Sequence, residues 1–223
     1  GDVLRVLPNG RLVSPQVNTY IGNGEEQELT TVFTWQGFRY IEAPLSLTPV
    51  EVRVIHADLA CRSDFSSCDE VLNWLWDAFR RTMLTNMHGG IPSDCPHYER
   101  RGYTGDGQLA CHAAMNMLDA KAFYRKWIED IADCRDVATG HIQYTAPYMH
   151  SGGGPGGWGC AIVAVPYEYW KMYGDEAPMR EMFDGMLEYF RFLEDHSECD
   201  LVTSDRAGEW CLGDWCVPHG VIL

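Results

Sequence analysis

The sequence predicts a mixed fold, with part of an antiparallel β-sandwich over residues 1–64 and a mainly helical part over residues 65–223. Two observations lead to this division. Apolar and polar side chains alternate with a period near two along parts of the first 60 residues, and a helical spacing of apolar residues replaces this alternation from about residue 67. The length of 223 residues suggests one or two domains.

Three stretches of the first 60 residues are expected to be strands, namely Glu28–Trp35, Phe38–Glu42 and Val50–His56. Each is rich in β-branched or aromatic residues, and clusters of Gly, Pro and Asn lie between them. Alternation of this kind favours an antiparallel sheet with one face in water. Sixty residues provide only a few strands, so we expect part of a sandwich.

The first helix is expected to begin at a capping box. In the sequence Ser67–Glu70 the serine would cap a free backbone amide and the glutamate would reach back. Apolar residues then follow at helical spacing and predict one buried face: Val71, Leu72, Leu75, Ala78, Phe79 and Met83.

Four further helices are expected at about 106–118, 119–133, 160–173 and from Pro178 onward. Gly174 is a typical C-terminal signal, and proline is favoured in a first helical turn. The buried stripes of the helices at 119–133 and from 178 are predicted to be Phe123, Trp127, Ile128 and Ile131, and Met182, Met186, Phe190 and Leu193. Four tryptophans in helical stripes are expected in the core: Trp74, Trp76, Trp127 and Trp170.

The formal net charge of −15 makes nucleic-acid binding improbable, because such a surface repels phosphate. The longest apolar run, Ala161–Val165, is far shorter than the roughly 18 residues of a membrane span. We therefore expect neither nucleic acid nor a membrane as a partner. The first residues show no pattern of a signal peptide.

Nine cysteines are present, and no two of them have the CxxC spacing of a zinc site. We expect most of them to be small buried hydrophobic residues in a reducing compartment. This usage favours the cytoplasm, although a periplasmic or secreted parent protein stays open. No cofactor and no metal are expected.

The densest group of chemically active side chains lies between the first two expected helices, in Ile91–Gln108. Asp94, Glu99 and Asp106 could raise one another's pKa by charge repulsion, which suits a carboxyl group to general acid catalysis. Arg100 could orient one of them. The alternative is a purely structural loop, with Asp106 as a helix N-cap and Arg100 in a salt bridge.

This stretch resembles the signature D-C-P-x-R-E-R-x-G-W-T-G-D-A-Q of the α-L-rhamnosidase family of inverting glycoside hydrolases. Further likeness lies in Phe33–Tyr40, similar to the family's F-x-x-x-G-F-R-Y, and in Asp58–Leu75, similar to its entry to the first barrel helix. Trp158–Asp175 resembles its W-G-D-A…P-W…Y-G-D segment. The resemblance covers nearly the whole chain.

The resemblance implies removal of terminal α-L-rhamnose from glycosides, with Glu99 as the general acid. Asp94 and Asp106 are implied to bind the sugar and to tune the acid. The family's catalytic domain is an (α/α)6 barrel, so residues 65–223 would form its N-terminal part and the remainder of the same polypeptide would complete it. The general base, which an inverting enzyme needs to activate water, would lie outside this segment.

Further substrate-binding candidates are His97, Arg100, Tyr103, Trp158, Asp214 and Trp215. Trp158 could stack on the apolar face of a deoxy sugar, or it could be a core residue. His97 could bind a hydroxyl group or satisfy the loop backbone. Asp214 and Trp215 belong to a segment from Glu209 that resembles a pocket-lining segment of the family.

Three residues depart from the family pattern: Tyr98 replaces Arg, Tyr103 replaces Trp and Cys160 replaces Asp. These departures leave the sugar open. The alternatives are a non-catalytic carbohydrate-binding protein, or a related (α/α)6 hydrolase for another deoxy sugar or a uronic acid. A uronate would need a cation in the pocket, for which Arg101 is the candidate.

Overall fold

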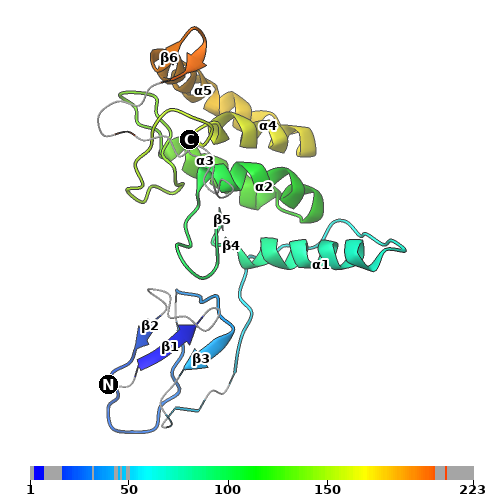
Figure 1. Cartoon of the computed structure of the whole chain (residues 1–223), viewed down its shortest axis with the longest axis vertical. Helices are drawn as coiled ribbons and strands as arrows, with labels where there is room; N and C mark the ends of the chain where they lie inside the picture. The colour runs from blue at the N-terminus through cyan, green and yellow to red at the C-terminus, as the bar shows by residue number, and fades with distance from the viewer. Residues whose placement is uncertain are drawn as a thin grey trace, which may run out of the picture.

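The computed structural model describes residues 3–7, 17–31, 33–42, 45, 47–48, 51–203 and 209. Within them a small sheet comes first and five helices follow, so the chain is mainly helical with few strands. Figure 1 shows the sheet at one end, connected by an extended stretch to the stacked helices. The order predicted from the change in hydrophobic period is confirmed.

The N-terminal sheet has three antiparallel strands, with β1 (Val3–Leu7) between β2 (Val17–Thr19) and β3 (Tyr40–Glu42). β3 confirms part of the strand expected at 38–42. The strands expected at 28–35 and 50–56 are wrong, because the described residues of both stretches lie outside any strand. Alternation fits a strand, but a strand also needs a neighbouring backbone to pair with, and the pattern does not supply one.

Helix α1 (Glu70–Thr85) has its N-cap two residues after the predicted one, Ser67. Its N-cap is Asp69, whose carboxylate accepts a hydrogen bond of 2.8 Å from the Val71 amide. Ser67 instead accepts a hydrogen bond from the amide of Asp69. The predicted capping box is therefore wrong in its residues. Serine and aspartate are both strong N-caps, and the sequence does not rank two of them that lie so close together.

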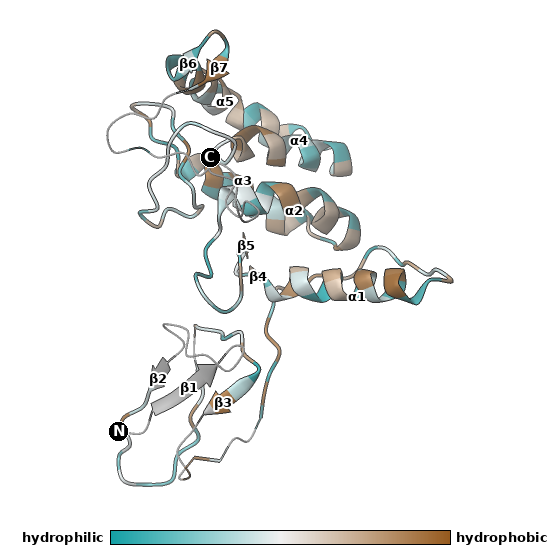
Figure 2. Ribbon diagram, viewed as in Figure 1, coloured by the Kyte–Doolittle hydropathy of each residue, from teal (hydrophilic) through white to brown (hydrophobic). Residues whose placement is uncertain are grey.

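The predicted apolar face of α1 is largely uncovered among the described residues. Met83 is buried, whereas Val71, Leu72 and Leu75 are 68%, 44% and 54% exposed. Figure 2 shows brown, hydrophobic turns along this helix. Trp74 is exposed as well, contrary to the prediction. An amphipathic stripe is buried only where another element packs against it.

The other four helices lie close to their predicted positions, as α2 (Thr104–Met117), α3 (Lys121–Asp133), α4 (Ala161–Tyr173) and α5 (Ala177–Asp195). Helix α4 packs against α2, α3 and α5. Gly174 ends α4 with φ of 66°, a left-handed conformation that glycine adopts at little cost. Two short hairpins were not predicted: β4 (Met87–His88) with β5 (Ile91–Pro92), and β6 (Ser197–Glu198) with β7 (Leu201–Val202).

The core lies between these helices and confirms the predicted stripe of α3, including the fully buried Trp127. The stripe predicted for α5 is partly wrong. Met186 is buried and Met182 and Leu193 are partly buried against the core, but Phe190 is exposed, and Tyr189 and Phe192 are buried instead. Trp170 is 40% exposed, contrary to the prediction. Apolar residues four positions apart can mark either of two adjacent faces of a helix. The neighbouring helices determine which of the two faces is buried.

The cysteines do not behave as expected. All seven described cysteines are free, but only Cys111 and Cys134 are buried, and Cys61, Cys68 and Cys199 are exposed. The prediction that most are buried is wrong. A separate finding is that no helix among the described residues is long and apolar enough to cross a membrane.

Candidate active site

The connection from β5 to α2 forms a closed loop that carries Glu99. The amide of Asp94 donates to the carbonyl oxygen of Arg101 at 3.0 Å, and the Asp94 carboxylate accepts from the Arg101 amide at 2.9 Å. These two bonds fasten the base of the loop. Glu99 lies between them in sequence and is exposed, so its carboxyl group is accessible to a ligand.

The start of α2 is fixed to a second loop. The Thr104 amide donates to the carbonyl oxygen of Tyr144 at 2.8 Å, and the amide of Ala146 donates to Gly102 at 2.9 Å. A Cβ at Gly102 would collide with the Ala146 carbonyl, so this close approach requires glycine. The N-cap position is occupied by Tyr103, which rules out Asp106 as the N-cap.

Asp106 lies in the first turn of α2, close to the other two carboxylates. Burial raises its pKa, and the charges of Asp94 and Glu99 raise it further. The repulsion predicted within this group raises the pKa of Asp106. A carboxyl group that keeps its proton to a higher pH can donate a hydrogen bond as well as accept one.

Tyr103 connects Glu99 to the helix start. Burial, and then a hydrogen bond with Glu99, raises the pKa of Tyr103 to about 12, while the charge of Arg101 lowers it. The phenol is therefore protonated at neutral pH and can donate to the Glu99 carboxylate. The structure brings together Glu99, Asp94, Asp106 and Tyr103.

Trp158 completes an aromatic wall beside these groups. Its ring lies 5.5 Å from the ring of Tyr103 in an edge-to-face arrangement, and 5.5 Å from that of Tyr144. It packs over Gly105, where a Cβ would lie 2.6 Å from the indole. Trp158 is half-buried rather than enclosed in the core, so part of the ring can contact a ligand. Gln108 donates to the Gly157 carbonyl at 2.6 Å and holds the glycine-rich loop beside α2.

Arg100 points toward the N-terminal segment. Its Nη1 donates to the carbonyl oxygen of Trp35 at 2.7 Å. Within the described part of the chain it forms no ion pair with a carboxylate. Neither the orientation of a carboxylate by Arg100 nor the alternative salt bridge is seen among the described residues.

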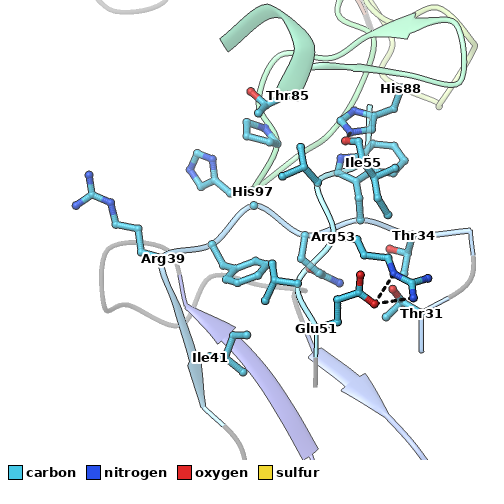
Figure 3. Close-up of a pocket in the computed structure, with 17 residues that line it drawn as sticks. Thr31, Thr34, Arg39, Ile41, Glu51, Arg53, Ile55, Thr85, His88 and His97 are labelled. Carbon is cyan, nitrogen blue, oxygen red and sulfur yellow. Dashed lines mark hydrogen bonds and ion pairs between the residues drawn. The ribbon is translucent and has the colours of Figure 1, made fainter. Parts of the chain in front are cut away.

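His97 lies on the other side of the same loop. It lines a cavity of about 740 Å³ together with Pro96 and residues of the N-terminal segment, as Figure 3 shows. None of the three site carboxylates lines this cavity.

Asp214 and Trp215 lie outside the described residues, but Glu209 of the same segment is described. Its carboxylate lies 2.9 Å from Nε2 of His196, whose Nδ1 lies 2.7 Å from the Phe192 carbonyl. A carbonyl only accepts, so Nδ1 donates to Phe192, and the ring connects α5 to the Glu209 carboxylate. The sequence does not predict this pairing, because His196 and Glu209 are 13 positions apart and no local spacing links them.

Among the described residues, no group of three or more His, Cys, Asp and Glu side chains is arranged to hold a metal ion.

A comparison with protein families matches residues 61–221 to the bacterial α-L-rhamnosidase 6-hairpin glycosidase domain. The chain belongs to this family. It is 28% identical to an α-L-rhamnosidase of Formosa agariphila over 94% of this chain and 25% of that protein. A Streptomyces avermitilis α-L-rhamnosidase is 31% identical over 86% of this chain and 19% of its own length.

Solved rhamnosidase structures have the same fold over most of the chain. The α-L-rhamnosidase of Dictyoglumus thermophilum aligns with a TM-score of 0.78 and 27% identity, covering 92% of this chain and 25% of that one. The S. avermitilis enzyme complexed with L-rhamnose also aligns with a TM-score of 0.78 and 27% identity, covering 96% and 22%. The chain thus spans about a quarter of the length of these rhamnosidases.

Proposed function

We propose that the polypeptide carrying this chain hydrolyses terminal α-L-rhamnosides with inversion, and that Glu99 is the general acid. Glu99 would protonate the departing glycosidic oxygen. A base outside this segment would remove a proton from water on the opposite face of the sugar. Membership of the rhamnosidase family and the likeness to a rhamnose-complexed relative support rhamnose as the substrate.

The position of Glu99 supports its role. It is an exposed residue on a loop that is fastened at Asp94 and Arg101, so a leaving group can reach it. The protonated phenol of Tyr103 hydrogen-bonds to it and restricts its orientation. Fixing the acid relative to the bond that breaks is itself a source of rate.

Asp94 and Asp106 are proposed to bind sugar hydroxyl groups. The raised pKa of Asp106 supports this role, because a carboxyl group that retains its proton can donate a hydrogen bond to a sugar hydroxyl as well as accept one. Trp158, half-buried beside Tyr103, is proposed to pack against the apolar face and methyl group of rhamnose.

Of the remaining candidate residues, two contact the N-terminal segment and two lie outside the described residues. Arg100 and His97 are proposed to act at the edge of the site, through the N-terminal segment rather than on the sugar ring. Asp214 and Trp215 are proposed to line the pocket. We also propose that residues 1–64 belong to a β-sandwich and residues 65–223 to an (α/α)6 barrel completed by the same polypeptide, which would cover the exposed apolar face of α1.

The observation that carries the proposal is the cluster of three carboxylates around the start of α2, in which Asp94 and Glu99 raise the pKa of Asp106. Its test is the configuration of the first sugar released from an α-L-rhamnoside. Proton NMR during the first turnovers of the full-length polypeptide should show β-L-rhamnose before mutarotation. Initial release of α-L-rhamnose would contradict the inverting mechanism, and no release would contradict the activity.

A uronic acid as the sugar is the second candidate, favoured by one observation. The charge of Arg101 lowers the pKa of Tyr103, so this cation lies close to the proposed acid. Cleavage of an aryl uronide in preference to an aryl rhamnoside would support it.

A further inference from the structure

The glycine-rich segment 151–157 leads directly into Trp158, the residue proposed to pack against the sugar. Five of its seven residues are glycine, and a chain of this composition loses much conformational entropy when it is ordered. Gly152 has φ of 66° and Gly156 has φ of 141°, conformations that other residues rarely adopt. Trp158 nevertheless has a defined contact with Tyr103. Its position therefore depends on the side chains that hold this segment.

Two side chains from different helices hold the last two carbonyl groups before Trp158. The phenol of Tyr189, on α5, donates a hydrogen bond of 2.7 Å to the carbonyl oxygen of Gly156. The side-chain amide of Gln108, on α2, donates to the next carbonyl oxygen, that of Gly157, at 2.6 Å. Helix α4, which begins shortly after Trp158, packs against both α2 and α5, and Figure 1 shows α5 beside it. The backbone that enters Trp158 is thus fastened to two neighbouring helices.

Tyr189 also contacts the backbone that follows Trp158. A Cβ at Gly159 would lie 2.6 Å from Cε2 of the Tyr189 ring and 2.7 Å from its hydroxyl oxygen, so the ring lies directly against this glycine. Sγ of Cys160 lies 3.9 Å from the same hydroxyl oxygen. Only 1% of Tyr189 is exposed. Because the residue is buried, any effect that it has on a bound sugar passes through its neighbours.

The contacts of Trp158 lead from this backbone to the proposed acid. The indole packs over Gly105 and lies edge-to-face against Tyr103, with 5.5 Å between the ring centres. Tyr103 in turn hydrogen-bonds to Glu99. A displacement of the backbone around Trp158 therefore moves the indole relative to the group that protonates the leaving oxygen.

We propose that Tyr189 is a positioning residue for the sugar site, which fixes the backbone on both sides of Trp158 and so holds the indole in place for the apolar face of rhamnose. The inference rests on the proposed function for the role of Trp158. The apolar face of the sugar takes no part in the bond that breaks, so this contact is equally strong before and during the reaction. Its weakening raises KM and leaves kcat nearly unchanged.

The test compares Tyr189→Phe with wild type in the full-length polypeptide, with 4-nitrophenyl α-L-rhamnoside as the substrate. The change keeps the ring against Gly159 and removes only the hydroxyl that donates to Gly156. Loss of one hydrogen bond should raise KM by roughly 3–10-fold. Tyr124→Phe is the matched control, because Tyr124 is fully buried and its hydroxyl has no hydrogen-bond partner among the described residues. It should leave KM and kcat unchanged.

A double-mutant cycle shows whether Tyr189 acts through Trp158. In a Trp158→Ala background, Tyr189→Phe should raise KM no further, because the ring that it positions is absent. A merely structural role would lower the melting temperature without this dependence on Trp158. An equal rise of KM in both backgrounds, or no rise with Trp158 present, would overturn the proposal.

Hydrogen exchange of backbone amides is the second arm, and it does not depend on activity. The amides of Cys160 and Ala161 donate at 3.3 Å to the carbonyl oxygens of Gly157 and Trp158, so their exchange reports on this backbone. Tyr189→Phe should speed their exchange by roughly 3–10-fold, and the control variant should not. Unchanged exchange would overturn the positioning. If wild type neither cleaves nor binds the rhamnoside, the proposed function fails, and the exchange rates still decide whether the phenol fixes this backbone.

Discussion

The guanidinium of Arg100 donates a hydrogen bond of 2.7 Å to the backbone carbonyl oxygen of Trp35, 65 residues away in sequence. Arg100 has φ of 55°, a left-handed conformation that is unfavourable for residues other than glycine. The bond therefore holds a strained residue directly beside Glu99. It ties the N-terminal segment to the proposed catalytic loop, a role for Arg100 that differs from binding the sugar.

Substitutions of Arg100 should separate the stabilisation by its hydrogen bond to Trp35 from the cost of its left-handed backbone conformation. Arg100→Ala keeps the left-handed residue and loses the hydrogen bond, so the free energy of unfolding should fall by about 1–3 kcal/mol. Arg100→Gly loses the same bond but removes the strain, and should be about 1 kcal/mol more stable than Arg100→Ala. Urea unfolding measures both. Equal stabilities of Arg100→Ala and wild type would show that this hydrogen bond does not stabilise the fold.

The start of α2 should tolerate no side chain at Gly107. A Cβ there would overlap the ring of Trp127, whose Nε1 donates to the Ala146 carbonyl at 3.0 Å. Gly107→Ala should lower the free energy of unfolding by about 1–3 kcal/mol through overpacking. Gly157→Ala is the control, because nothing lies within 4 Å of its added Cβ. Thermal unfolding that ranks the two variants equally would show that the contact is not tight.

Asp106 should make stability fall as pH rises. Its folded-state pKa is raised, so the folded chain retains this proton at pH values where the unfolded chain has lost it. The stabilisation is complete below the unfolded pKa of about 3.9 and is lost as pH rises through the folded pKa. Asp106→Asn should remove this dependence and gain about 0.5 kcal/mol at pH 7, a small effect because solvent screens the group.

The same Asp106→Asn variant should lose activity while it gains stability, since Asp106 is proposed to bind the sugar. Melting temperatures from pH 3 to pH 8, with rates at pH 7, provide the measurement, and Asp184→Asn at an exposed position of α5 is the control. If Asp106→Asn is less stable than wild type at pH 7, the assigned burial and repulsion are wrong.

Tyr103 should stay protonated well beyond neutral pH and should orient Glu99. Tyr103→Phe keeps the ring against Trp158 but removes the hydroxyl, so we expect the melting temperature to change little and kcat to fall by about 3–10-fold, the value of one hydrogen bond. Ultraviolet titration should lose a tyrosinate step near pH 12. An unchanged kcat would show that Tyr103 does not orient Glu99.

The helices could be predicted well because the sequence signals that determine them are local. Apolar spacing, a proline in the first turn of α5 and a glycine after α4 each act over a few residues, and the structure confirms these elements. The strands expected at 28–35 and 50–56 failed because pairing depends on distant backbone. For the same reason the sheet contains β1 and β2, which no local pattern had identified.

The candidate site was predictable to the extent that it is contiguous in sequence. Asp94, Glu99 and Asp106 lie within one loop and the adjoining helical turn, and the pKa of Asp106 responds to both neighbours. The partner of Arg100 and the stack of His88 on Trp35 join distant segments. Such contacts follow from the fold, so neither they nor the cavity they surround could be read from the sequence.

The central claim is that Glu99 protonates the leaving group, and Glu99→Gln in the full-length polypeptide tests it most directly. A disaccharide has a poor leaving group that needs the acid, whereas nitrophenolate departs with little help. We expect Glu99→Gln to lower kcat/KM for a rhamnosyl disaccharide by about 100–10,000-fold and to affect the aryl rhamnoside far less. Glu26→Gln, the same change at an exposed residue of the N-terminal segment, should affect neither. Equal losses on both substrates, or no loss on the disaccharide, would contradict the assignment of Glu99 as the acid.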